Sequence, residues 1–191
     1  MGVGASVAIA IAIAGCAGHE SSADRAQASY PVAKLDFGTV PTAAETSRYF
    51  SYPADGRGLP PGSGTHEQGA RVYQAKCMAC HGEKLEGTKL GDKLIGGRGT
   101  LVNNDPTKAP VKTIESYWPY ATTVFDYVKR AMPFNAPGSL TDNEIYAVTA
   151  YILGEAKIVP AGTVIDASSL PKVQMPNRNG FVSPDPRPDV H

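Results

Sequence analysis

Apolar side chains recur with helical spacing in three stretches of the chain. Two of these stretches open with capping boxes, Thr65-His66-Glu67-Gln68 and Thr141-Asp142-Asn143-Glu144, which satisfy the first free N–H groups of a helix. The first box predicts a helix that runs to Cys77, and the second predicts one that ends at Gly154. The apolar face of the last helix consists of Ile145, Val148, Tyr151 and Ile152. A further helix is predicted over about residues 121–131, with Val124, Phe125 and Val128 on its apolar face.

The segments outside these helices are rich in glycine, proline and small polar residues. Thr42-Ala43-Ala44-Glu45 is a third capping box and predicts a short helix that carries Tyr49 and Phe50. Gly and Pro mark residues 53–64 as a loop, and residues 82–110 form a long glycine-containing segment that needs a surface to wrap. We therefore expect an N-terminal tether and arm over 16–64, a compact all-α core over 65–157 and an extended, proline-rich tail over 158–191.

The net charge of the chain argues against some classes of binding partner. The 191 residues contain 18 Lys and Arg and 18 Asp and Glu, so the formal net charge is zero. A neutral chain argues against nucleic acid as the main partner, and it leaves only local electrostatic steering.

The first 18 residues carry no charged side chain, and an alternating Ala and Ile run ends in Gly15-Cys16. This is typical of a signal peptide over 1–15, and Ile13-Ala14-Gly15-Cys16 resembles the lipoprotein box, whose cysteine is lipidated. No Lys or Arg precedes the run, so an uncleaved helical anchor and simple secretion remain alternatives. All three place the domain outside the cytoplasm, in the periplasm, and the favoured one anchors it to the membrane through Cys16.

The run Cys77-Met78-Ala79-Cys80-His81 carries the chemistry. Two thiols three residues apart on one helical turn can both bond to the vinyl groups of a haem, and the adjacent imidazole can bind the iron. The other readings fit less well. A redox dithiol would follow a strand, whereas residues 69–76 have a helical pattern, and a zinc site needs four ligands. The motif predicts one covalent haem c.

The iron needs a sixth ligand, and its identity sets the chemistry. A methionine opposite histidine raises the reduction potential, whereas an open position permits ligand binding or peroxide chemistry. Met132 follows a predicted helix far enough beyond His81 to cross to the opposite haem face, and it is the preferred ligand. Most methionines only fill space in a core. The alternatives are no ligand at all, or one of Met175, His19, His66 and His191.

The order of Gly69, Tyr73, the haem motif, Met132-Pro133 and Tyr151 resembles class I cytochrome c over residues 65–154. The resemblance implies three main helices around one haem, with Gly69 and Tyr73 packed against the last helix near Tyr151 and with Met132 as the distal ligand. The family usually has a proline after the histidine whose carbonyl accepts the imidazole hydrogen, and residues 91–96 have none. We expect another backbone carbonyl in that loop to orient His81.

Longer motifs are similar to SoxD, the cytochrome subunit of sulfane dehydrogenase in thiosulfate oxidation. They are Asp55-Gly56-Arg57-Gly58-Leu59-Pro60-Pro61-Gly62-Ser63-Gly64-Thr65, Ser116-Tyr117-Trp118-Pro119-Tyr120-Ala121, Arg130-Ala131-Met132-Pro133-Phe134 and Met175-Pro176-Asn177-Arg178-Asn179-Gly180-Phe181. Longer members of that group carry a second haem domain, whereas this chain has one haem motif.

The SoxD resemblance implies an electron-transfer subunit that is not catalytic alone. It would accept electrons from a molybdenum-cofactor sulfur dehydrogenase and pass them to a cytochrome c or an oxidase. A membrane-anchored shuttle to a terminal oxidase is the main alternative, and a haem peroxidase is disfavoured by a Met ligand. For docking, the aromatics near Met132 are Trp118, Tyr120 and Phe134, which could instead pack on the porphyrin. The long arms favour a dedicated subunit over a shuttle, and Arg178 and Phe181 in the tail are residue types that interfaces favour. The alternative is that the arms only cover their own domain.

Overall fold

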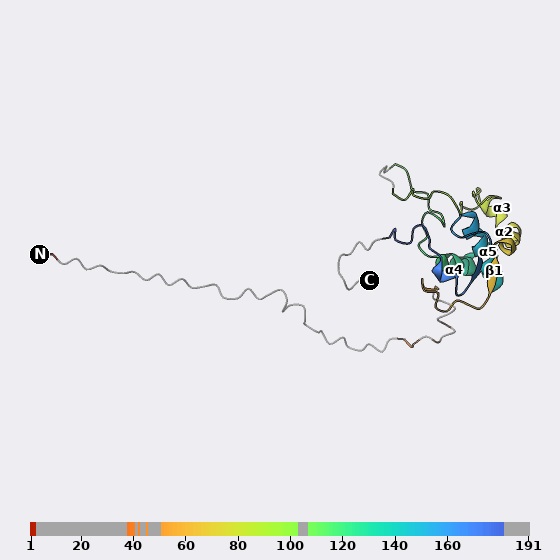
Figure 1. Cartoon of the computed structure of the whole chain (residues 1–191), viewed down its shortest axis with the longest axis horizontal. Coiled ribbons are helices and arrows are strands. Elements are labelled where there is room, and N and C mark those ends of the chain that lie inside the picture. Colours follow the sequence, from red (N-terminus) through yellow and green to blue (C-terminus); the bar gives the residue numbers. More distant parts are fainter. Residues whose placement is uncertain (3–37, 41, 43–44, 46–50, 103–106, 182–191) are drawn as a thin grey trace. The chain divides into compact units, whose positions relative to one another are not determined.

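The structure is a computed structural model, and it describes residues 1–2, 38–40, 42, 45, 51–102 and 107–181 (Figure 1). The chain divides into two units, Met1–Val40 and Pro41–His191, and every helix and strand below belongs to the second. Cys16, His19 and His191 lie outside the described residues, as does the predicted signal segment apart from residues 1 and 2.

Three helices build the domain: α2 (His66–Lys76), α4 (Ala121–Ala131) and α5 (Asp142–Glu155). The short helix α3 (Met78–His81) follows α2 directly. The capping boxes predicted at the starts of α2 and α5 are present, because Thr65 accepts from the Gln68 N–H and Thr141 from the Glu144 N–H, while each partner side chain bonds back. The three predicted core helices are confirmed, with α5 ending one residue later than expected.

The third capping box also forms, and beyond Glu45 the short helix that it was expected to start lies outside the described residues. The Glu45 carboxylate accepts the Thr42 N–H at 2.8 Å, and the Glu45 N–H donates to the Thr42 hydroxyl at 3.2 Å. Tyr49 and Phe50 lie outside the described residues.

The core lies between α2, α4 and α5. Gly69 and Tyr73 are the buried residues of α2, and the Tyr73 ring lies 5.1 Å from the Tyr151 ring of α5. From α4, the fully buried Phe125 ring lies 4.4 Å from that of Tyr146. The packing of Gly69 and Tyr73 against the last helix, which the cytochrome resemblance implied, is confirmed.

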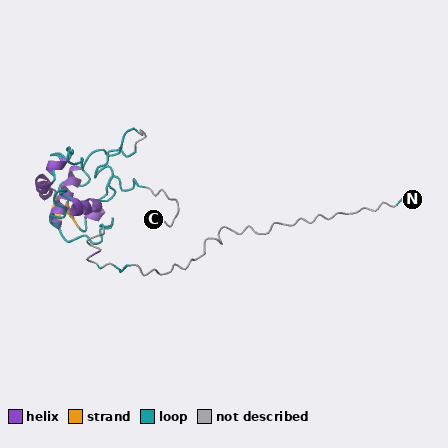
Figure 2. Cartoon of the chain, turned by 180° about the vertical axis from the view of Figure 1, so that it is seen from behind, coloured by secondary structure: helices purple, strands orange, loops and turns teal. Residues whose placement is uncertain are grey.

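The sequence pattern did not predict the two short strands. Strand β1 (Ser63–Thr65) pairs antiparallel with β2 (Val164–Asp166), with Gly64 opposite Ile165. Figure 2 shows how small these strands are beside the helices, and how much of the domain is loop. A strand of three residues is too short for an alternating pattern to identify, so the pairing decides its conformation.

The N-terminal arm from residue 51 and the tail to residue 181 both pack on this core. Tyr52 is only 8% exposed, and the Tyr146 hydroxyl donates to the Pro60 carbonyl at 2.8 Å. The tail is less extended than expected: β2 is followed by the 3-10 helix η2 (Leu170–Lys172), and it buries Leu170, Val173 and Met175. Arm and tail also meet, because a Cβ on Gly56 would overlap the Pro171 ring.

Residues 82–102 and 107–120 form the irregular segment that joins α3 to α4. Leu85 anchors it, since this fully buried residue accepts the Leu94 N–H at 2.9 Å. The Leu94 carbonyl in turn accepts the Ile114 N–H at 3.0 Å. Within the described part of the chain, no helix has the length and apolar character needed to cross a membrane.

Candidate functional site

The haem motif forms a single tight turn at the end of α2. The Cys77 N–H donates to the Tyr73 carbonyl at 2.8 Å, and the N–H groups of Cys80 and His81 donate to the Cys77 carbonyl at 3.1 and 2.9 Å. Cys77 and Cys80 are both half-buried free thiols. Burial, and to a smaller extent the neighbouring Cys80, raises the pKa of the Cys77 thiol to about 11. The two thiols follow one another on one turn, as bonding to a single haem edge requires.

His81 is oriented by the loop that follows it. Its Nδ1 lies 2.7 Å from the Asp92 carbonyl oxygen, and because a carbonyl can only accept, Nδ1 carries the hydrogen. Nε2 therefore keeps its lone pair for a metal. The expectation that a backbone carbonyl within residues 91–96 would replace the missing proline is confirmed.

Further hydrogen bonds hold this loop against the haem turn. The Thr88 hydroxyl donates to the Cys80 carbonyl at 2.7 Å, and the Gly87 N–H donates to the His81 carbonyl at 2.8 Å. A Cβ on Gly91 would lie 3.0 Å from the Cys80 carbonyl oxygen, so a larger residue would press on the turn. Sequence analysis did not identify Thr88, because a lone threonine in a glycine-rich loop carries no distinguishing pattern.

Tyr73 connects the turn to the helical core. Its hydroxyl donates to the Gly82 carbonyl at 2.7 Å, directly after His81, while its ring packs on Tyr151. Burial is the main reason that the pKa of Tyr73 is raised well above its ordinary value of 10. The hydroxyl therefore stays protonated and can keep donating this hydrogen bond at neutral pH.

The two candidate methionines occupy different surroundings. Met132 caps the C-terminus of α4, its N–H donates to the Val128 carbonyl at 3.2 Å, and its half-buried side chain packs against the core. Met175 is 3% exposed and belongs to the core itself, where a packing role accounts for it. Of the alternative histidine ligands, His66 pairs with Glu155 at 2.8 Å.

Most of the aromatic residues considered for docking contact their own chain. Trp118 packs edge-on against Tyr127 at 5.5 Å, and the Arg178 guanidinium lies 5.2 Å from the centre of the Tyr120 ring. Phe134 differs, because it is 82% exposed.

The tail also contacts its own domain at Tyr117, which precedes Trp118 in the sequence. The Asn177 amide donates to the Tyr117 carbonyl at 2.6 Å, and the Phe181 ring lies 5.2 Å from the Tyr117 ring. Up to residue 181 the structure thus favours the alternative in which the tail covers its own domain.

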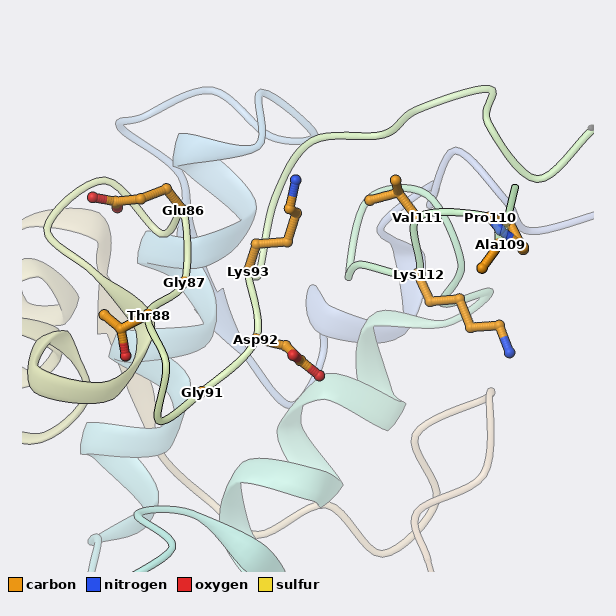
Figure 3. A pocket seen from close by; sticks show the side chains of 10 residues that line it. All are labelled: Glu86, Gly87, Thr88, Gly91, Asp92, Lys93, Ala109, Pro110, Val111 and Lys112. Carbon is orange, nitrogen blue, oxygen red and sulfur yellow. The ribbon is translucent and has the colours of Figure 1, made fainter. Parts of the chain in front are cut away.

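An open pocket of about 650 Å³ lies beside the His81 loop (Figure 3). Residues 86–88 and 91–93 line it on one side and residues 109–112 on the other, and its charged residues include Asp92, Lys93 and Lys112. None of the four predicted haem-binding residues lines this pocket, which shares with them only the loop whose Asp92 carbonyl binds His81.

The donor set fits a covalent haem. The thiols of Cys77 and Cys80 lie on one turn, and Nδ1 of the adjacent His81 donates to a backbone carbonyl. The thioether of Met132 lies at the C-terminal end of α4. Cys77, Cys80 and His81 could supply the two thioether bonds and one axial ligand, and Met132 the other.

Comparison with known proteins identifies a family and a similar solved structure. The model for the cytochrome c family matches residues 66–155. The crystal structure of the sulfane dehydrogenase SoxCD from Paracoccus pantotrophus is 39% identical, with a TM-score of 0.69 over 81% of this chain and 74% of that chain. The thiosulfate dehydrogenase TsdBA from Marichromatium purpuratum is 22% identical over 53% of this chain and 20% of that chain, and its TM-score of 0.34 supports no conclusion. No curated protein matches the chain.

The SoxCD match extends beyond the family model into the arm or the tail, because it covers 81% of the chain. Together with the three main helices, it confirms the predicted class I cytochrome c fold. The chain belongs to the cytochrome c family, in the group of SoxD, the cytochrome subunit of SoxCD, and its cofactor is therefore one covalently bound haem c.

Proposed function

We propose that this protein is the electron-accepting cytochrome subunit of a molybdenum-dependent sulfane or sulfite dehydrogenase, and that it passes electrons on to a cytochrome c or an oxidase. The similarity to SoxCD at 39% identity over 81% of the chain carries this proposal. A cytochrome domain alone would account for a match over residues 66–155 only.

In this proposal the chain holds the haem through four side chains. Cys77 and Cys80 would attach it covalently, and His81 and Met132 would bind the iron. Bound haem c supplies a single-electron carrier whose iron alternates between the ferric and ferrous states. The Asp92 carbonyl keeps the His81 ring in one tautomer and orientation, which limits the reorganisation that accompanies electron transfer.

Docking of the partner relies mainly on contacts around Phe134. Residues 65–154 hold ten Lys and Arg and nine Asp and Glu, so long-range attraction is weak. Phe134 follows Met132-Pro133, is 82% exposed, and belongs to the residue types that form interface anchors.

The proposed location is the periplasm, with the chain anchored as a lipoprotein at Cys16. The apolar run that ends at Gly15-Cys16 supports export, and attachment of c-type haem after export agrees with it. More than one acyl chain at Cys16 would hold the protein firmly on the membrane, whereas one chain binds only marginally.

A shuttle that serves a terminal oxidase remains the second candidate. The long arms were an argument for a dedicated subunit, but the arm and the tail up to residue 181 pack on their own domain. They therefore do not discriminate between the two roles, and the preference for a subunit rests on the SoxCD similarity.

Haem reduction by the partner tests the proposal. The holoprotein is mixed in a stopped-flow instrument with the molybdenum-cofactor dehydrogenase subunit of the same cells and its sulfur substrate. We expect rapid haem reduction, and Phe134→Glu should slow the second-order rate about tenfold or more, as loss of an interface anchor does. Val102→Glu is the matched control, because Val102 is similarly exposed, at 87%, and lies outside the loop that holds the haem turn, and it should leave the rate unchanged. Reduction only by unrelated donors would favour the shuttle.

A further inference from the structure

The N-terminal arm binds the helix that leads to Met132. The Tyr52 backbone N–H donates to Oδ1 of Asp126 in α4 at 3.1 Å, and this hydrogen bond is buried. The Tyr52 side chain is 8% exposed, and its ring lies edge-on to Phe125 at 5.6 Å. A residue 74 positions earlier in the sequence is thus fixed to the middle of α4.

The same carboxylate oxygen also holds the last turn of α4. Oδ1 of Asp126 accepts the Nε–H of Arg130 at 2.8 Å, one turn further along the helix. The Arg130 guanidinium in turn lies over the Tyr52 ring, 5.7 Å from its centre. The Asp126 side chain is 12% exposed and that of Arg130 is 29% exposed, so removing the carboxylate would leave a partly buried guanidinium without this partner.

This cluster ends two residues before the proposed axial ligand. α4 ends at Ala131, and the Met132 N–H makes a last helical hydrogen bond to Val128. Lys129 ties the same turn to α5 through Asp142. The last turn is therefore anchored to α5 by Lys129 and to the arm by Arg130 and Asp126. A helix end with fewer anchors frays more readily, and Met132 would move with it.

We propose that Asp126 is a positioning residue through which Tyr52 holds the last turn of α4 and keeps Met132 on the haem iron. This inference rests on the proposed role of Met132 as axial ligand. It goes beyond that role because Tyr52 lies outside residues 66–155, the part that matches the cytochrome c family. The arm thereby becomes part of the haem site, acting on the ligand from a distance.

Ligand competition in the oxidised holoprotein tests the proposal, because imidazole binds the iron only when Met132 has left it. We expect Asp126→Ala to raise the apparent imidazole affinity about fivefold to thirtyfold, the change that one lost anchor makes to a two-state equilibrium. The methionine-to-iron charge-transfer band should weaken in parallel. Tyr52→Leu, which removes the ring below the guanidinium but keeps the N–H donor, should have a smaller effect in the same direction.

Asp55→Asn is the matched control, since Asp55 pairs with Arg57 on the same arm but its side chain is 56% exposed. It should leave imidazole affinity and the band unchanged. If Asp126→Ala and Tyr52→Leu both behave like Asp55→Asn while Met132→Ala opens the iron, the positioning role is wrong and the ligand assignment stands. If Met132→Ala leaves the spectrum unchanged, both are wrong. Should Asp126→Ala fail to mature, Tyr52→Leu decides alone.

Discussion

Gly69 of α2 meets Tyr151 of α5 so closely that a Cβ on Gly69 would lie 2.7 Å from the Tyr151 Cβ. The same Cβ would overlap the Ala147 carbonyl group. The two helices therefore touch backbone to backbone. Because α2 leads straight into Cys77, this crossing sets where the haem turn lies relative to α5.

Gly69→Ala should lower the free energy of unfolding by about 3 kcal/mol or more, because neither helix backbone can make room for a methyl group. Urea unfolding of the holoprotein measures the change. Gly162→Ala is the control, since a Cβ there meets no atom within 4 Å, and it should stay within about 0.5 kcal/mol of the parent. Equal effects of the two substitutions would contradict the close crossing.

Met132→Ala should lower the reduction potential and let imidazole or cyanide bind the iron, because the thioether that favours the ferrous state is lost. Met175→Ala should keep the six-coordinate spectrum, yet cost about 2–5 kcal/mol of stability through the cavity left in the core. Absorption spectra and thermal unfolding separate the two effects. A high-spin haem in Met175→Ala alone would show that the ligand assignment is wrong.

Removal of residues 173–191 should destabilise the domain. It deletes the buried Val173 and Met175, each worth about 1.5–3 kcal/mol of burial, and the hydrogen bond from Asn177 to the Tyr117 carbonyl. The control truncation, 182–191, removes none of the contacts described above. Denaturant unfolding of both holoproteins checks this, and equal stability of the two would mean that the tail is dispensable to the domain.

Stability should depend on Asp166 in acid. The Ser168 hydroxyl, followed by the Ser169 and Ser168 N–H groups, lowers the pKa of this carboxyl from its usual 3.8 to about 2. Because the pKa is lower in the folded chain, the charged form stabilises the fold above about pH 4, and this contribution is lost as the pH falls towards about 2. Asp166→Asn should thus destabilise the protein at pH 6 and match the parent near pH 2.

Denaturant unfolding across this pH range measures the Asp166 effect. Ser168→Ala should reproduce part of it, because it removes the donor with the largest influence. A loss in Asp166→Asn that stays constant from pH 6 to pH 2 would show that the carboxylate charge is not involved.

If Cys16 carries the lipid anchor, Cys16→Ser should block lipid modification and processing, so that the chain keeps residues 1–15. Mass spectrometry of the membrane-bound protein should find an N-terminal, acylated Cys16. An unmodified chain cut elsewhere would instead support simple secretion, and an uncut chain would support the helical anchor.

The features that sequence determined are those set by neighbours a few residues apart. The thiols and imidazole of Cys77, Cys80 and His81 are placed by one helical turn, and the boxes at Thr65 and Thr141 each close over three residues. Such local geometry is fixed by the backbone, so residue spacing alone reveals the haem motif and the helix starts.

The tertiary structure decided which residues from distant parts of the sequence contact the haem turn, the strands and the helices. Every residue of the loop after His81 offers the same carbonyl, and only the folded path brings that of Asp92 within 2.7 Å of Nδ1. Likewise, β1 gains its strand conformation from β2, about a hundred residues later, and Asp126 gains its partner from Tyr52 in the arm. The residues of the arm and the tail could equally have contacted a partner protein. Their burial on this chain's own core depends on long-range packing, which no local sequence pattern encodes.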